Sequence, residues 1–357
     1  MNGELSVALA STLKPKPTSD DKLGFGTIFT DHMFVMDYEV GMGWHSPRIE
    51  PYGTFSIQPS NMTLHYGQAI FEGMKAYRTV NGKVKIFRPR DYLSRMNRSA
   101  ERLCIPKIDV EFVFSALKKL LSIESDWVPA SEGTSLYIRP FIIAMDPYIG
   151  VRPSRTYRLF IILSPVGAYY AEGFKPVKIW VENKYVRAVK GGMGMAKTAG
   201  NYASSILAAE EAKENGYTQV LWLDGVERRY IEEVGTMNIF FKIDDTIITP
   251  ALEGSILGGM TRDSVLRLSR EWGLKVSEQP LTIEEVYEAH DKGKLQEIFG
   301  TGTAAVISPV SALNWKGNII NVNGGQAGET SVKLYDEITG IQYGKHADIF
   351  KWMEEVD

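Results

Sequence analysis

The residue best suited to chemistry in this sequence is Lys197, which lies in an uncharged, glycine-rich loop, GGMGMAKTAGNY, at residues 191–202. A stretch of helical character, residues 203–213, follows the loop and ends before Gly216. A lysine among glycines and apolar residues is poorly placed for salt bridging, and desolvation lowers the pKa of an ammonium group. A lysine of this kind can form a Schiff base. The alternative is a solvated lysine in a flexible surface loop.

A pair of acids, Glu232 and Glu233, is the second candidate, because it precedes the sequence Val-Gly-Thr-Met-Asn at residues 234–238. A pyridine-type cofactor acts as an electron sink only while its ring nitrogen stays protonated, and a buried carboxylate beside that nitrogen keeps it so. The alternative is the solvated acidic end of a hairpin.

Two glycine motifs could bind an anion. The sequence GSILGGMTR at residues 254–262 opens a predicted helix, whose first N–H groups and dipole favour a phosphate. The alternative is an ordinary glycine turn with Thr261 as N-cap. GTGTAA at residues 300–305 matches G-x-G-x-x-A, but the following VISPV cannot continue a helix and residues 318–327 contain no acid. We therefore exclude dinucleotide binding, while a backbone site for an anion stays open.

The remaining polar candidates are weaker when taken alone. Arg95 stands among Arg88, Arg90, Arg98 and Arg102, three of which share its predicted helix, and this favours a solvated helix face. The five histidines are scattered without a metal-binding spacing. The single cysteine, Cys104, excludes an internal disulfide and a thiolate metal cage. We predict a buried core position for Cys104 and a reducing, cytoplasmic location for the chain.

Length and composition indicate a globular protein of about two domains, with 357 residues, 44% hydrophobic residues and a net charge of −3. The sequence has no basic block, so neither nucleic acid nor an anionic membrane is an expected partner. The longest apolar runs, such as residues 159–163, are far too short to span a bilayer. The first 17 residues lack the features of a signal or transit peptide.

These residues must be positioned by two predicted domains, residues 1–166 and 177–357, joined by a glycine-containing linker at residues 167–176. The first domain reads as mixed α/β. It begins with a frayed lead-in, residues 1–24, and has a turn-rich stretch at residues 47–59. Its predicted strands are residues 25–38, 84–87, 135–144 and 157–166, and its predicted helices are residues 89–102 and 110–123.

The second domain is predicted to carry Lys197 between a strand at residues 177–182 and the helix that follows the loop. Hairpins are expected around Asp224-Gly225 and Asp244-Asp245. The other predicted strands are residues 219–223, 229–233, 238–243, 246–249 and 304–310, and the other predicted helices are residues 261–272, 286–292 and 331–344.

Taken together, the motifs resemble the branched-chain amino acid aminotransferases, which are pyridoxal-phosphate enzymes of fold type IV. The matching segments span residues 25–344 in the right order: Phe29–Met33, Leu64–Gly67, Phe71–Ala76, Arg95 with Arg98–Ala100, Tyr137–Pro140, Pro165–Tyr169, Lys197–Tyr202, Glu233–Asn238, Gly300–Ala304 and Ile341–Gly344. The resemblance implies a small N-terminal α/β domain and a larger C-terminal domain with a mixed, barrel-like sheet. It also implies ping-pong transfer of the amino group of leucine, isoleucine or valine to 2-oxoglutarate, giving branched-chain 2-oxo acids and glutamate.

The resemblance assigns a role to each matching residue. Lys197 would hold pyridoxal 5′-phosphate as a Schiff base and move a proton from the substrate Cα to C4′. Glu233 would pair with the ring nitrogen, and Tyr202 would hydrogen-bond the ring hydroxyl. Further residues would bind the phosphate (Arg95, Met260, Thr261, Thr303), the substrate carboxylate (Tyr66, Thr236, Ala304) and the apolar side chain (Phe25, Phe71, Tyr137, Tyr169). Arg139 would receive the glutamate carboxylate, and Ile149 and Val151 would reach the neighbouring subunit's pocket in a homodimer.

One departure and two alternatives accompany this resemblance. Some animal members carry a C-x-x-C redox pair where this chain has Ala305 and Ser308, so thiol regulation at that place is excluded. Other fold-type-IV enzymes, a D-amino acid aminotransferase or an aminodeoxychorismate lyase, share the lysine and the glutamate but lack the context of Phe71–Lys75 and Gly300–Ala304. A cofactor-binding protein without turnover is the alternative from another class.

Overall fold

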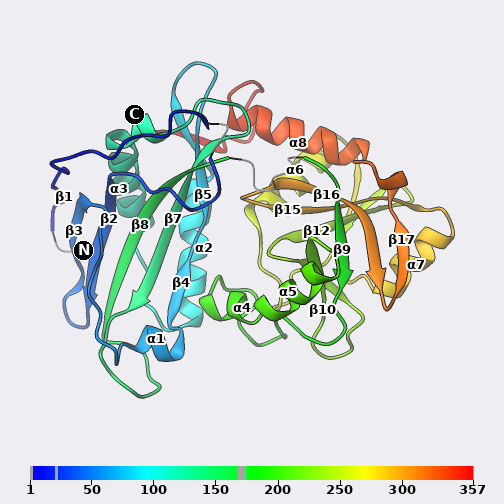
Figure 1. The fold of residues 1–357 in the computed structure, drawn as a ribbon, viewed down its shortest axis with the longest axis horizontal. Coiled ribbons are helices and arrows are strands. Elements are labelled where there is room, and N and C mark those ends of the chain that lie inside the picture. The colour runs from blue at the N-terminus through cyan, green and yellow to red at the C-terminus, as the bar shows by residue number, and fades with distance from the viewer. Residues whose placement is uncertain (1–2, 21–22, 168–173, 357) are drawn as a thin grey trace. The chain divides into compact units, whose positions relative to one another are not determined.

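The computed structural model describes residues 3–20, 23–167 and 174–356 as a mixed α/β protein (Figure 1). Two compact units share the chain. The first unit contains Met1–Tyr169, Ala196–Ala199 and Gly340–Asp357, and the second contains Tyr170–Met195 and Gly200–Thr339. They differ from the predicted domains in two segments, because the short segment that carries Lys197 and the C-terminal residues belong to the first unit.

The first unit is built on a nine-stranded sheet in which β1 pairs with β3 in parallel and the other pairs are antiparallel. The strand order is β1 (Ser6–Val7), β3 (Gly43–Pro51), β2 (His32–Glu39), β8 (Thr156–Val166), β7 (Ser135–Ala144), β5 (Met74–Arg78), β6 (Val84–Phe87) and β18 (Met353–Glu355), and β4 (Ala69–Phe71) pairs with β7. Strand β7 alternates between buried and half-buried residues. This alternation gives the sheet two different faces, one of which carries several predicted substrate residues.

Two helices, α2 (Pro89–Arg102) and α3 (Val110–Ile123), pack on each other and against this sheet (Figure 1). Both span the predicted ranges. Helix α2 begins at a proline, which lacks the N–H group that a first helical turn leaves unused. Tyr92, Met96 and Ala100, which share one face of this helix, are buried. A one-turn helix, α1 (Met62–Tyr66), and a 3₁₀ turn, η2 (Ser125–Trp127), complete the helical part of the described first unit.

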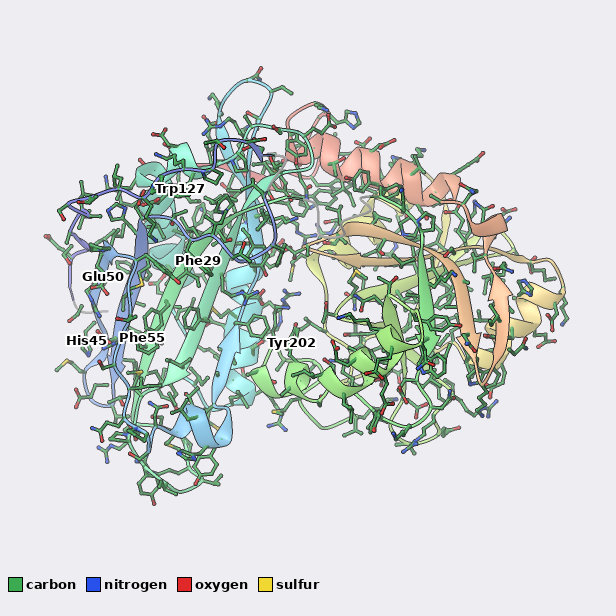
Figure 2. All side chains as sticks on the ribbon, in the orientation of Figure 1. Phe29, His45, Glu50, Phe55, Trp127 and Tyr202 are labelled. Carbon is green, nitrogen blue, oxygen red and sulfur yellow. The ribbon has the colours of Figure 1, made fainter. Side chains whose placement is uncertain are left out.

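The N-terminal segment is ordered against the first sheet, so the frayed lead-in is wrong for residues 3–20. The Ala10 N–H donates to His32 Nε2 at 2.8 Å, and the Lys14 N–H donates to Asp31 Oδ1 at 2.7 Å. The other oxygen of Asp31 accepts from the indole of Trp127, which is labelled in Figure 2. Because the side chains of His32 and of the preceding Asp31 accept hydrogen bonds from the backbone of the segment, a sequence without an apolar pattern is held in place.

Two further expectations for the first unit are corrected. Residues 47–51 of the predicted turn-rich stretch belong to β3, which pairs with β2 along nearly its whole length. Cys104 is exposed, because it lies just beyond the end of α2 with a φ of 54° and not in the core.

The second unit contains a second nine-stranded sheet of mixed direction. The strand order is β11 (Ile231–Val234), β10 (Gln219–Leu223), β9 (Val177–Val181), β16 (Val306–Trp315), β15 (Leu295–Gly302), β12 (Asn238–Ile243), β13 (Thr246–Thr249) and β14 (Lys275–Glu278), and β17 (Asn318–Asn321) pairs with β16. The core of this unit consists largely of the branched and aromatic residues of these strands.

The helices of the second unit connect or flank its strands. They are α4 (Ala199–Ala203), α5 (Ile206–Glu214), α6 (Met260–Glu271), α7 (Ile283–Asp291) and α8 (Glu329–Gln342), with a 3₁₀ turn, η3 (Asn323–Gly325). Ala199 of α4 and residues 340–342 of α8 are assigned to the first unit. In two of these helices, a side chain accepts hydrogen bonds from the first backbone N–H groups. Thr282 and Glu285 form a capping box at α7, and buried Glu297 of β15 accepts the Thr330 and Ser331 N–H groups at α8. No helix among the described residues is long and apolar enough to cross a bilayer.

Candidate active site

The backbone around Lys197 is fixed by residues of the first unit. Its N–H donates to Ser99 Oγ of α2 at 2.8 Å, and its carbonyl accepts the Phe71 N–H at 3.1 Å. Thr198 continues the contact with β4 as an isolated bridge to Ile70. The half-buried side chain lies with Nζ 4.9 Å from the centroid of the Phe71 ring. The predicted flexible-surface alternative is therefore wrong, because the chain is held on both sides of this lysine.

Arg95 is buried and paired with an acid that the sequence did not single out. Its Nε and Nη2 atoms donate to the two carboxylate oxygens of Glu72 at 2.8 and 2.7 Å. Both side chains are at most 5% exposed. The solvated helix face that Arg95 alone suggested is wrong, because Arg95 belongs to the buried side of α2. The bidentate pair fixes the guanidinium plane and does not involve Nη1.

One face of the first sheet brings together four of the predicted substrate residues. Tyr137 stacks edge-on against Phe25, with ring centroids 5.0 Å apart. Arg139 donates to the Tyr137 hydroxyl at 2.9 Å, and its guanidinium lies 4.7 Å from the Phe71 ring. Gly73 makes room for this arrangement, because a Cβ there would lie 2.0 Å from the Tyr137 hydroxyl. The result is an apolar wall that carries one cation.

A second cation, Lys75, belongs to the same face because it is the register partner of Tyr137 across β5 and β7. The residue is only 6% exposed, and burial lowers the pKa of the Lys75 ammonium to about 8. This lysine stands in the quoted Phe71–Ala76 motif, but no role was predicted for it.

In the second unit, Glu233 lies in β11 and is 4% exposed. The Leu257 N–H donates to its Oε1 at 2.7 Å, and its Oε2 lies 3.4 Å from Nε of Arg187. A backbone donor and a buried guanidinium therefore contact the two oxygens of this carboxyl group. The solvated-hairpin alternative for Glu233 is therefore wrong.

Two turns of the second unit lie side by side and contain three of the predicted residues. Thr236 is exposed in the turn between Val234 and Met237, which exchange two backbone hydrogen bonds. Thr303 and Ala304 lie in the loop between β15 and β16, which closes at the pair Gly302 and Val306. Met237 packs against Gly300 and Gly302, where a Cβ would approach the methionine side chain to 3.0 Å. The loop joins two strands, so the rejected dinucleotide motif lacks the helix it needs.

Met260 and Thr261 form the first turn of α6 and are buried. The N-cap is Gly259, so the alternative with Thr261 as N-cap is wrong, and Gly259 has no side chain to satisfy the first N–H groups. Asn238 lies beside it and donates to the Leu257 carbonyl at 2.8 Å. A helix N-terminus capped by glycine presents backbone donors and a positive partial charge to an anion.

The remaining predicted residues lie in other elements or outside the described residues. Tyr202 lies in α4, where it is labelled in Figure 2, and Tyr66 ends α1 with 40% of its surface exposed. Ile149 and Val151 are 70% and 87% exposed. Tyr169, the fourth predicted pocket residue, lies outside the described residues, as does most of the predicted linker.

Sequence reasoning missed the partners Glu72, Ser99 and Arg187. Glu72 and Ser99 stand inside motifs that were recognised, but a spacing of 23 residues from Glu72 to Arg95 carries no signal of pairing. Arg187 lies ten residues before Lys197 without a motif of its own. Among the residues that the structure describes, no group of three or more His, Cys, Asp and Glu could hold a metal ion.

Residues 69–313 match the family profile of amino-transferase class IV, and this match includes Lys197, Glu233 and both turns. Because the matched region is more than half of the chain, the chain belongs to the class IV aminotransferases.

Within this class, the chain is similar to branched-chain aminotransferases. It is 59% identical to branched-chain-amino-acid aminotransferase 2 of Bacillus subtilis, over 99% of this chain and 97% of that protein. It is 56% identical to branched-chain-amino-acid transaminase 1 of the same organism, over 96% of each. The crystal structure of the Escherichia coli branched-chain amino acid aminotransferase has a TM-score of 0.76 at 27% identity, covering 92% of this chain and 99% of that one. A T.th. branched-chain amino acid aminotransferase, solved with N-(5′-phosphopyridoxyl)-L-glutamate, has a TM-score of 0.73 at 27% identity, covering 90% and 98%.

Proposed function

We propose that this protein transfers the amino group of L-leucine, L-isoleucine and L-valine to 2-oxoglutarate, with pyridoxal 5′-phosphate as cofactor. The observation that carries the proposal is the 59% identity to a branched-chain-amino-acid aminotransferase over 99% of this chain. The alternative fold-type-IV activities are not favoured, because the similar proteins with high identity bear the branched-chain name.

The described residues fit this cofactor. A buried carboxylate, Glu233, is suited to a protonated ring nitrogen, while buried Arg95 and the glycine-capped start of α6 are suited to a phosphate. When bound, pyridoxal 5′-phosphate acts as an electron sink that stabilises the negative charge developing at the substrate Cα. Lys197 would bond covalently to the cofactor and move the Cα proton, and Glu233 would hold the ring-nitrogen proton.

The other residues would orient the cofactor and the substrate. Tyr202 would hydrogen-bond the ring hydroxyl, and the phosphate would be bound by Arg95, Met260, Thr261 and Thr303. The backbone of the two adjacent turns, at Thr236 and Ala304, would bind the substrate α-carboxylate together with Tyr66.

The same pocket must accept an apolar and an acidic side chain in turn. Phe25, Phe71, Tyr137 and Tyr169 would contact the branched side chain, and Arg139 would bind the distal carboxylate of glutamate. The hydrogen bond from Arg139 to the Tyr137 hydroxyl gives the cation a partner while an apolar substrate is bound. A pocket of this kind distinguishes one methylene by only about 1–3 kcal/mol, so three related substrates are expected.

The test is the visible absorption of the protein loaded with pyridoxal 5′-phosphate. Adding L-leucine should bleach the band, and adding 2-oxoglutarate should restore it. Lys197→Ala should abolish this cycle. The matched control is Lys190→Ala, which removes an exposed lysine of the preceding segment, paired with Glu253, and should keep the cycle. A protein that binds the cofactor but never bleaches would support the alternative of binding without turnover.

We also propose a homodimer and a cytoplasmic location. The exposed apolar residues Tyr148, Ile149 and Val151 form a loop of the kind that a second copy would cover. Val151→Asp should convert the dimer to a monomer in sedimentation analysis, and a wild-type monomer would contradict the proposal.

The proposed cytoplasmic location is supported by the single cysteine, which favours a reducing compartment.

A further inference from the structure

A cluster of buried charged residues surrounds Glu233 within the second unit. Arg187 Nε lies 3.4 Å from Glu233 Oε2, and Arg187 Nη2 donates to the Ser255 carbonyl at 2.6 Å. The Ser255 hydroxyl in turn donates to Oε1 of Glu232. The side chains of Arg187, Glu232 and Glu233 are each at least nine-tenths buried. Arg187 therefore pairs directly with Glu233 and is linked to Glu232 only through Ser255. As consecutive residues of β11, the two acids point to opposite faces of the strand.

Two atoms of this cluster lack a hydrogen-bond partner, namely Arg187 Nε and Glu232 Oε2. Arg187 Nε forms an ion pair with the Glu233 oxygen at 3.4 Å but makes no hydrogen bond to it. A buried polar atom without a partner destabilises the folded state, because it has lost its hydrogen bonds to water. A small movement of Arg187 towards Glu233 would satisfy its Nε atom.

The other charged groups around Glu232 do not neutralise it. Asp224 faces it but accepts four backbone N–H groups of its own loop, from Val226, Glu227, Arg229 and Tyr230. Lys190 is paired with the exposed carboxylate of Glu253. Burial therefore dominates and raises the pKa of Glu232. Glu232 and Ser255 line a cavity of about 430 Å³ that also contacts Asp224 and Lys190.

We propose that Arg187 is a positioning residue that orients Glu233 towards the ring nitrogen of the cofactor, and that Glu232 is kept as a neutral carboxylic acid so that it does not compete for this arginine. The proposal rests on the proposed role of Glu233. With Glu232 neutral, the charges of Arg187 and Glu233 cancel, and Ser255 links the neutral acid to the arginine through its hydroxyl and carbonyl. If Glu232 ionised, it would draw Arg187 away from Glu233.

The first experiment replaces the arginine. Arg187→Gln should weaken binding of pyridoxal 5′-phosphate to the apoprotein by about tenfold, the effect of one hydrogen bond to a charged group. It should also shift the ¹⁵N NMR signal of the labelled ring nitrogen towards its unprotonated value and lower kcat without raising KM for leucine. Arg187→Lys, which keeps the charge, should partly restore all three. The matched control is Arg229→Gln, which removes an exposed arginine paired with Glu284 in the same unit.

The second experiment addresses Glu232. The infrared difference spectrum between wild type and Glu232→Gln at neutral pH should contain the carbonyl band of a protonated carboxylic acid. Absence of this band would overturn the assignment of a neutral Glu232. An unchanged cofactor affinity and ring-nitrogen signal in Arg187→Gln would overturn the role of the arginine.

Glu233→Gln separates this inference from the proposed function. If Glu233→Gln keeps a protonated ring nitrogen and normal turnover, the proposed role of Glu233 fails. If Glu233→Gln loses both while Arg187→Gln and Arg187→Lys behave as wild type, only the inference about Arg187 is wrong. Thermal unfolding of each apoprotein shows whether a variant is folded, and the lysine variant still tests the proposal if the glutamine variant is not.

Discussion

The two units supply the candidate residues by different means. In the first unit, long side chains provide the contacts and are held by other side chains, as in the Arg95–Glu72 pair and the Arg139–Tyr137 hydrogen bond. In the second unit, apart from Glu233, the proposed contacts are mostly backbone N–H groups of two turns and of the start of α6. Side-chain contacts fail when a partner is removed, whereas backbone contacts fail when a side chain is added where none fits.

The largest effect is expected from breaking the buried pair of the first unit. Glu72→Gln leaves the Arg95 cation without its counter-charge, which should lower the free energy of unfolding by about 3–5 kcal/mol. The measurement is urea unfolding of the apoprotein. Glu111→Gln is the matched control, because its partner Arg90 is solvent-exposed on the same helix as Arg95, and its effect should be about 0–1 kcal/mol. Equal losses of stability in both variants would contradict the expected difference between the buried pair and the exposed pair.

The matching test in the second unit adds a methyl group. A Cβ at Gly194, in the loop before Lys197, would lie 1.9 Å from the Ser255 carbonyl oxygen, which is backbone and cannot rotate away. Gly194→Ala should therefore lower the free energy of unfolding by about 2–3 kcal/mol. Gly258→Ala meets only an ordinary contact of 3.4 Å and should cost less than about 1 kcal/mol. A Gly194→Ala protein as stable as wild type would show that the loop is not tightly packed.

Lys75 provides a pH test of the first unit. Its pKa in the folded protein is about 8, below the ordinary value of 10.5. The folded state thus disfavours the charged ammonium, which lowers the free energy of unfolding. This destabilisation is absent above about pH 10.5, grows as the pH falls, and is complete below about pH 8. The stability of wild type relative to Lys75→Met should rise by roughly 2 kcal/mol between pH 8 and pH 10.5. Urea unfolding of both proteins across this range measures the difference, and a constant difference would contradict it.

The smallest effect is expected at the hydroxyl of Tyr137. Tyr137→Phe removes the acceptor of Arg139 while keeping the aromatic wall, a loss of about 1 kcal/mol. We expect KM for 2-oxoglutarate to change several-fold and KM for leucine to change by less than about twofold. The comparison of the two KM changes is the test. Equal changes for 2-oxoglutarate and leucine would mean that the Tyr137 hydroxyl positions the other side chains of this face as well, and not Arg139 in particular.

The amino-acid sequence by itself determined the main helices and strands and the class of protein. Helices α2 and α3 and strands β7, β10, β12 and β13 coincide with predicted ranges because their signals are local: apolar periodicity, a proline at a helix start, and turn residues between strands. The short strands β1, β14, β17 and β18 were missed, since each is stabilised by a neighbour that local periodicity does not reveal.

Only the tertiary structure decided which charges meet. Glu72 and Arg95 are 23 residues apart, Arg187 and Glu233 are 46 apart, and Ser99 holds the backbone of Lys197 from 98 residues away. The position of Lys75 opposite Tyr137 follows from strand register, which also places it on the face of Arg139. The physical reason is that burial and pairing set the charge and orientation of a side chain, and both depend on neighbours brought together by folding.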